Sequence, residues 1–218
     1  MDDDSPQARW ERRTEMLLAV ASLVFLASYA VLVLGQGLAA SWRDACVTAM
    51  LGAWAIFAID YAARWRLSGQ GPRFVRTHLV DTLVLALPLL RPLRVVRLYE
   101  AVLRRRGEPR LTLQARVISY AGLSALLLGF SGALAVYQQE RAAPGASIRT
   151  FGDAVWWACA TLATVGYGDV VPVTPWGRTI AVGMMACGLA LLGAVTGSFS
   201  SWLLQVFSRE GDERPPGS

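Results

Sequence analysis

The stretch TVGYGD, residues 164–169, decides how the rest of this chain is interpreted. Gly166 and Gly168 alternate with larger residues, and glycine adopts backbone angles that a residue with a Cβ resists. Successive carbonyl oxygens of this stretch can therefore aim at one line. A stack of such oxygens can replace the water shell of a cation. The hydroxyl of Thr164 can add one more oxygen at the inner end, and the ring of Tyr167 can turn outwards and brace the loop.

An apolar stretch, residues 153–163, leads directly into this motif. At a rise of about 1.5 Å per residue it is too short to cross a hydrocarbon core of about 30 Å. We therefore predict a re-entrant helix whose carboxyl end, the negative end of its dipole, points at a central cation. Non-helical backbone at membrane depth is tolerated only where protein or water surrounds it, and an ion filter is such a place.

Together, the helix and the motif resemble the pore helix and signature filter of potassium channels. The resemblance implies a selectivity filter formed by Thr164, Val165, Gly166, Tyr167 and Gly168, with K⁺ held by the first four of these residues. It also implies that Asp169 pairs with Trp156 behind the filter and that Trp157 supports it. Ala160 stands where some bacterial channels carry a buried glutamate, so we do not expect inactivation that depends on that acid.

Composition places the chain in a membrane. Its 218 residues are 54% hydrophobic, and the mean hydropathy is +0.40, which is typical of an integral membrane protein. All 21 basic residues are arginines. They fall between the apolar spans, so membrane topology explains the net charge of +5 better than nucleic-acid binding does. The cysteines (Cys46, Cys159 and Cys187) are far apart, and they indicate neither a metal site nor a disulfide framework.

The front half contains four predicted membrane helices after a short cytoplasmic head, residues 1–15, which we expect to be partly disordered. The first apolar run is long enough to span, and we interpret it as a retained helix rather than a cleaved signal peptide. The third is short and is followed by prolines. The predicted helices cover residues 16–34, about 45–63, about 78–87, and 90–98.

The fourth of these helices carries a basic stripe, Arg91, Arg94 and Arg97, at every third position. A charge inside hydrocarbon is costly, so each arginine needs an acid or water nearby, and Asp60 and Asp81 are the candidates. The pattern over residues 16–106 resembles the voltage-sensor domain of six-segment cation channels. In that resemblance Phe57 and Asp60 match the charge-transfer site of the second helix. The stripe departs from the family at Glu100 and Leu103. The alternative is that these arginines are static ion-pair partners in a domain that does not move.

The back half is predicted as a pore domain, residues 117–207, that follows a linker at residues 107–116. Its first span covers residues 117–137, a polar turret follows, and its last helix covers residues 179–207. The last helix resembles the inner helix of small bacterial potassium channels, and Gly188 matches the gating hinge. The alternative is that Gly188 only permits tight packing. Residues 208–218 are predicted to be a cytoplasmic tail.

The predicted fold is an all-α membrane protein with a four-helix voltage-sensor-like domain followed by a two-helix pore domain. Six spans with both termini in the cytoplasm leave few arginines outside and obey the positive-inside rule; the external ones would be Arg43, Arg141, Arg149 and Arg178. One filter loop cannot surround an ion, so we expect a homotetramer.

We therefore expect a voltage-gated potassium channel of the plasma membrane, with K⁺ and the bilayer as its partners and no cofactor or nucleic acid. A potassium transporter subunit is the alternative from another class. It is disfavoured because such transporters carry four degenerate repeats in one chain, and no internal repeat is found here. An enzyme is not expected, since His78 is the single histidine and no nucleophile motif is present.

Overall fold

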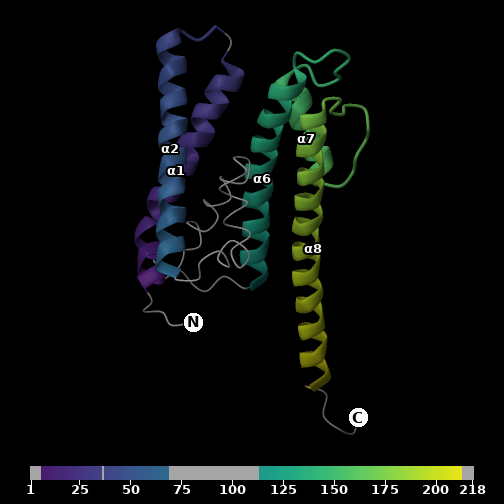
Figure 1. Cartoon of the computed structure of the whole chain (residues 1–218). Helices are drawn as coiled ribbons and strands as arrows, with labels where there is room; N and C mark the ends of the chain where they lie inside the picture. Colours follow the sequence, from purple (N-terminus) through teal and green to yellow (C-terminus); the bar gives the residue numbers. More distant parts are fainter. Residues whose placement is uncertain (1–5, 36, 69–112, 213–218) are drawn as a thin grey trace.

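The computed structural model of this chain describes residues 6–35, 37–68 and 113–212. These residues form α1 (Pro6–Leu34), α2 (Ala40–Ser68), α6 (Leu113–Glu140), α7 (Phe151–Leu162) and α8 (Pro175–Asp212) (Figure 1). The predicted third and fourth spans lie outside the described residues, and so do Asp81 and the three arginines of the stripe.

The described helices form two pairs. α1 packs along α2, and α6 packs along α8. The short α7 contacts both α6 and α8, and it lies near the upper end of that pair in Figure 1. The beginning of α1 and the end of α8 lie at the opposite, lower end. The two pairs touch where α1 meets α6.

Each long helix is apolar and long enough to cross a bilayer. The candidate spans are Thr14–Leu34, Ala40–Leu67, Ala115–Glu140 and Pro175–Leu204. α7, with 12 residues, is too short to span. The prediction of an all-helical membrane protein is therefore confirmed for the described part of the chain. Several boundaries differ from expectation, because α1 begins at Pro6, inside the predicted head, α6 begins at Leu113, inside the predicted linker, and α8 ends at Asp212, inside the predicted tail. α2 also extends beyond its predicted span at both ends.

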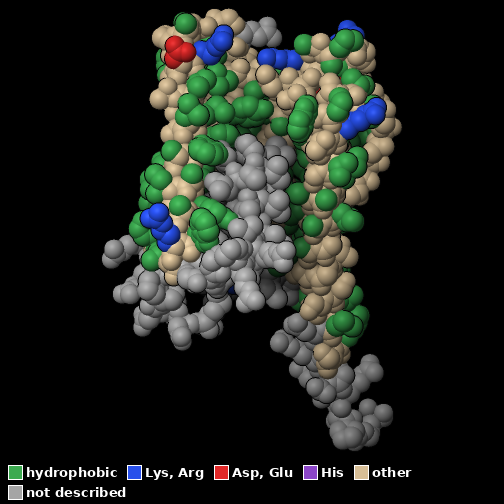
Figure 2. All heavy atoms as spheres, in the orientation of Figure 1, with side chains coloured by type: hydrophobic (Ala, Val, Ile, Leu, Met, Phe, Trp, Pro, Cys, Tyr) green, Lys and Arg blue, Asp and Glu red, His purple; other side chains and the backbone are tan. Residues whose placement is uncertain are grey.

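Large hydrophobic side chains lie on the outside of both helix pairs, as Figure 2 shows. Such a surface suits a hydrocarbon solvent and would be unusual on a protein in water. The most exposed of them include Leu51, Ile59, Leu126, Val182 and Leu189, each at least 63% exposed.

Two hydrophobic cores hold the helices together. The larger core joins α6, α7 and α8 and also receives Leu26 and Val33 of α1; its fully buried members include Leu134, Ile148 and Met184. The smaller core lies between α1 and α2 and contains Leu18, Ala21, Phe25, Ala53 and Phe57. The short helix α7 is thus fixed by the larger core.

The start of α7 is closed by a capping box. The backbone N–H of Asp153 donates to the hydroxyl of Thr150, and the carboxylate of Asp153 accepts from the backbone N–H of Thr150 at 2.8 Å and of Arg149 at 3.0 Å. These bonds, above all those with Thr150, hold the pKa of Asp153 below its ordinary value of 3.8. The cap is therefore complete above that value and is lost as the pH falls through the lowered pKa.

Candidate ion-binding filter

Residues 164–168 have an unusual backbone. Thr164, Gly166 and Gly168 have φ values of +57°, +56° and +76°, whereas Val165 and Tyr167 do not have positive φ. Alternation between the two kinds of conformation turns successive peptide groups to the same side of the chain. A positive φ is costly for a β-branched residue such as Thr164, and strain of this kind gathers at functional sites.

The end of α7 orients these peptide groups. The backbone N–H groups of Val165 and Gly166 both donate to the carbonyl oxygen of Ala160, at 2.9 and 3.2 Å. In a trans peptide the C=O points opposite to the N–H of the same unit. The carbonyl oxygens of Thr164 and Val165 therefore both point away from Ala160 and toward the same side. A one-sided row of oxygens is what binding of a dehydrated cation requires.

Aromatic side chains of α7 brace the outer half of the filter. The indole N–H of Trp156 donates to Asp169 Oδ2 at 2.8 Å. The ring of Trp156 also stacks on the ring of Tyr167, with centroids 5.4 Å apart and planes 9° from parallel. Trp157, the next residue of α7, is instead buried in the larger core. Trp156 thus contacts the filter region directly, and Trp157 holds the helix.

The loop that leaves the filter is held by the turret. The hydroxyl of Ser147 accepts from the backbone N–H of Val171 at 2.9 Å and donates to the carbonyl of the same residue at 3.1 Å. Ser147 lies between Ala146 and Ile148, and both of these neighbours are buried. The turret is therefore anchored in the core at the point where it binds the exit loop.

Glu140, the last residue of α6, is a second anchor of the exit loop, and sequence analysis missed it. Its side chain is fully buried. Its carboxylate accepts from Val173 N at 3.0 Å, from Thr174 N at 2.9 Å and from the hydroxyl of Thr174 at 2.6 Å. Thr174 Oγ1 in turn accepts from Gly177 N, near the start of α8. The carboxylate thus connects the C-terminal end of α6 to the N-terminal end of α8. Its negative charge is favourable there, because the N-terminus of a helix carries a partial positive charge.

Gly188 lies where α8 passes the end of α7. A Cβ at this position would come within 2.9 Å of the carbonyl oxygen of Leu162 and 3.1 Å of its Cα. These contacts are with backbone, which cannot move aside as a flexible side chain can. α8 continues as a helix through this point. Close packing against α7 is therefore sufficient to explain the glycine.

We expect Gly188→Ala to destabilise the protein by about 1–3 kcal/mol, because the added methyl overpacks the contact with α7. Gly193→Ala on the same helix is the control, since a Cβ there meets nothing within 4 Å. Alanine suits a helix better than glycine by about 1 kcal/mol, so the control should be neutral or stabilising. Thermal unfolding of the purified variants measures both. Equal stabilities with a changed open probability would instead favour the hinge.

Phe57 and Asp60 lie on one face of α2, toward α1. Phe57 belongs to the smaller core. Asp60 is 3% exposed, and its carboxylate forms an ion pair with Arg64 at 2.9 Å. The same carboxylate accepts from the indole of Trp10 at 3.2 Å and the hydroxyl of Thr14 at 3.3 Å. A buried acid is thus present where sequence analysis expected a counter-charge, and it also joins α1 to α2.

Comparisons with known proteins find similarity to ion channels in the second half of the chain. Residues 123–205 match a family described as ion channel. A voltage-gated potassium channel of Aeropyrum pernix is 42% identical over 79 residues, which is 36% of this chain and 27% of that one. The calcium-gated potassium channel TvoK of Thermoplasma volcanium is 37% identical over 75 residues, or 34% and 22% of the two chains.

A cyclic nucleotide-gated potassium channel of Mesorhizobium japonicum is 36% identical over 83 residues, which is 38% of this chain and 23% of that one. The chain thus matches about a quarter of the length of these relatives. The relatives differ in what gates them, but each is named as a potassium channel. Residues 123–205, with their helices long and apolar enough to cross a membrane and the loop at residues 164–168, are therefore similar to an ion-channel domain of the kind that potassium channels contain.

Proposed function

We propose that this chain is one subunit of a potassium-selective channel that conducts K⁺ passively and opens in response to voltage. The observation that carries the proposal is the backbone of residues 164–168. Its alternating φ values and the shared acceptor at Ala160 support a one-sided row of oxygens. Carbonyl oxygens in such a row replace the hydration shell of K⁺, and several adjacent sites let ions enter and leave.

Four copies around one axis would complete the pore. A single filter strand supplies oxygens on only one side of an ion, so other copies must supply the rest. In the single chain Val165 is 54% exposed and Tyr167 is 66% exposed, and their partner Trp156 is 48% exposed. Large apolar groups that are exposed beside a functional loop are typical of an interface, which supports assembly through this region.

The voltage response would come from the arginine stripe of the front half. One elementary charge that crosses the membrane field is worth about 2.3 kcal/mol per 100 mV, so twelve charges in a tetramer would supply at most roughly 28 kcal/mol per 100 mV. The buried carboxylate of Asp60, which pairs with Arg64 in this structure, supports the proposal because a moving arginine needs an acid along its path. A static front domain is the competing proposal for this half of the chain.

Current through the purified protein in planar bilayers tests the function directly. With K⁺ and Na⁺ on opposite sides, we expect a reversal potential near the K⁺ equilibrium value and an open probability that changes with voltage. A reversal potential that does not distinguish K⁺ from Na⁺ would contradict the selective filter. Selective current with an open probability flat in voltage would retain the filter and reject the voltage sensor.

Arg94→Gln and Arg97→Gln are expected to make the dependence of open probability on voltage shallower. If each arginine crosses the whole field, each substitution removes about 2.3 kcal/mol per 100 mV in every subunit. Arg43→Gln, in the first turn of α2, is the control and should leave the slope unchanged. The slope is measured from currents during voltage steps. An unchanged slope in both stripe variants would mean that these arginines do not move.

Trp156→Phe is expected to leave the fold intact and to shorten the time for which the filter conducts. The variant keeps a ring to stack on Tyr167 but loses the hydrogen bond to Asp169. A hydrogen bond to a charged group is worth about 1.5–3 kcal/mol. We expect the current to decay several-fold faster during a sustained step. Trp157→Phe is the matched control, since Trp157 lies in the core, and its current should decay as in the parent protein.

A further inference from the structure

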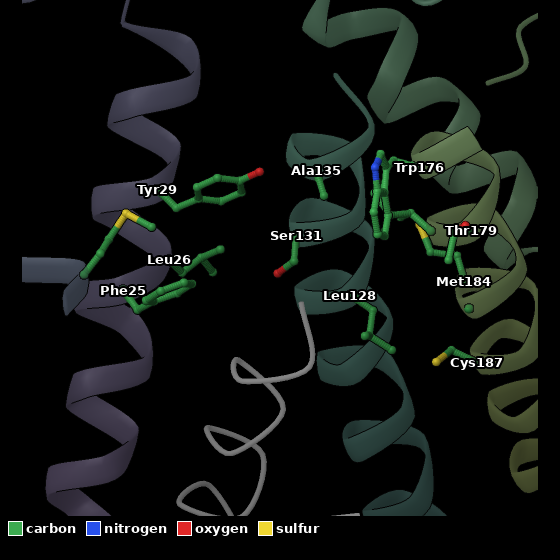
Figure 3. A pocket seen from close by; sticks show the side chains of 13 residues that line it. Phe25, Leu26, Tyr29, Leu128, Ser131, Ala135, Trp176, Thr179, Met184 and Cys187 are labelled. Carbon is green, nitrogen blue, oxygen red and sulfur yellow. The ribbon is translucent and has the colours of Figure 1, made fainter. Parts of the chain in front are cut away.

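A cavity of about 460 Å³ lies between the two helix pairs. Its walls come from α1, α2, α6 and α8, and Figure 3 shows the side chains of Phe25 and Tyr29 on one side of it and those of Trp176 and Cys187 on the other. Its volume is within the range of known ligand sites, about 300–1,000 Å³. The cavity is separate from the filter, whose residues do not line it.

The walls of the cavity offer few hydrogen-bond partners to water and no opposite charge to a charged ligand. Its described lining contains no charged residue. Its hydroxyl groups belong to Tyr29, Ser131 and Thr179, and the last two are already engaged within their own helices. Ser131 donates to the carbonyl of Leu127 at 2.7 Å, and Thr179 donates to the carbonyl of Pro175 at 2.9 Å. Water enters a cavity only where it finds polar partners, so an apolar occupant fits this one.

The cavity is long and lies at membrane depth. All four helices that line it have the length and hydropathy of membrane spans. Along α8 the lining extends from Trp176 to Cys187, which is about 16 Å at 1.5 Å per residue. An unfilled space of this size would deprive its walls of dispersion contacts. The surrounding medium at this depth is hydrocarbon chains, which are long, thin and uncharged.

We propose that the cavity binds one acyl chain of a membrane phospholipid, held between the α1–α2 pair and the α6–α8 pair. A second copy of the protein fits less well, because the rigid face of a helix cannot fill a recess that has helices on several sides. The bound acyl chain would fill the space between α1 and α8 and keep the two helices apart. This site does not depend on ion conduction, so it can be tested without any current.

Gly183 offers a way to fill the cavity with protein. It lines the cavity, and a Cβ at this position would meet nothing within 4 Å. Gly183→Phe therefore places a ring in the space that the acyl chain would occupy. Ala135→Phe, on α6, fills the cavity from another wall and serves if the first variant does not fold. Gly193→Phe is the matched control, because its site on α8 is also open but does not line the cavity.

The experiment uses the full chain in nanodiscs of phosphatidylcholine that carries a photoactivatable diazirine in the middle of one acyl chain. After irradiation, mass spectrometry locates the adducts. Adducts on outward-facing residues of α2, such as Leu51 and Ile59, report ordinary contact with the bilayer and provide the reference. Size-exclusion chromatography before irradiation shows that each variant is folded.

We expect adducts on Ile180 and Cys187, which line the cavity and are partly exposed, at least as abundant as those on the reference residues. In Gly183→Phe or Ala135→Phe they should fall by roughly fivefold or more, because the ring takes the space and the contacts of the chain. Gly193→Phe should leave them unchanged. Adducts that avoid the cavity in the parent protein would show that protein covers it, either another part of this chain or a second copy. Adducts that persist in both filling variants would show nonspecific bilayer contact. Either result would overturn the proposal.

Discussion

Gly168→Ala is expected to abolish K⁺-selective current. Gly168 has φ +76°, a conformation that costs a residue with a Cβ about 1–2 kcal/mol, or roughly 4–8 kcal/mol in a ring of four chains. Relief of that strain would rotate the peptide groups on either side and turn carbonyl oxygens away from the ion. We expect K⁺ current per unit of protein to fall at least about tenfold, since each 1.4 kcal/mol is a factor of ten. Any residual current should discriminate less between K⁺ and Na⁺.

Gly145→Ala is the matched control for this substitution. Gly145 has almost the same φ, +75°, and a Cβ at either glycine meets nothing within 4 Å. The two changes therefore carry the same local strain, but Gly145 lies in the turret. Its variant should retain selective current with at most a small loss of stability. If both variants conducted alike, the conformation of Gly168 would not matter for permeation. Reversal potentials in planar bilayers distinguish these outcomes.

Glu140→Ala is expected to cause a loss of stability that is large for a single substitution. It removes the acceptor for three donors at the end of the filter exit loop and leaves an empty space where the carboxylate was buried. An unsatisfied buried polar group costs about 1–3 kcal/mol, and we expect about 3–5 kcal/mol in total because the three donors share one network. Thermal unfolding followed by the loss of the monodisperse peak of the purified protein measures the effect.

Two further variants make this test specific. Glu140→Gln keeps one acceptor oxygen but turns an amide N–H group toward the donors, so its loss should lie between that of the alanine variant and zero. Gln139→Ala changes the neighbouring exposed residue and should have little effect. If Glu140→Ala were no less stable than Gln139→Ala, the carboxylate would not hold the exit loop. In Glu140→Ala, where the exit loop has lost this anchor, the K⁺ current should also decay faster during a sustained voltage step.

Local patterns were sufficient for much of the fold. Apolar runs predicted four of the helices that the structure describes, because a continuous apolar run of about 20 residues has the length at which a helix crosses hydrocarbon. The shortness of residues 153–163 predicted α7 for the same reason. The helix boundaries were less predictable. Polar residues continue α1 back to Pro6, because a helix that already exists is extended at little cost.

The residues that hold the filter from outside could be predicted only in part. Trp156 and Asp169 belong to the helix and motif that together resemble the pore helix and filter of potassium channels, so resemblance was enough to name them. The capping box at Thr150 and Asp153 has a sequence signal that spacing alone could have revealed. Glu140 has none, because an acid at the end of an apolar helix is usually solvated. Its burial depends on the exit loop, which lies 33 residues away in the chain at its nearest hydrogen-bonded residue. The arginine stripe and the tetramer remain predictions.

The sequence by itself determined that the chain is a membrane protein with an ion-filter motif, because hydropathy, helix length and glycine placement are local properties of the residues. Only the tertiary structure decided which groups support that motif and where space remains. The burial of Glu140, the contact that excludes a Cβ at Gly188, and the cavity beside Gly183 each arise where helices distant in sequence meet. Such features depend on the distances between helices, and no single segment of the sequence contains them.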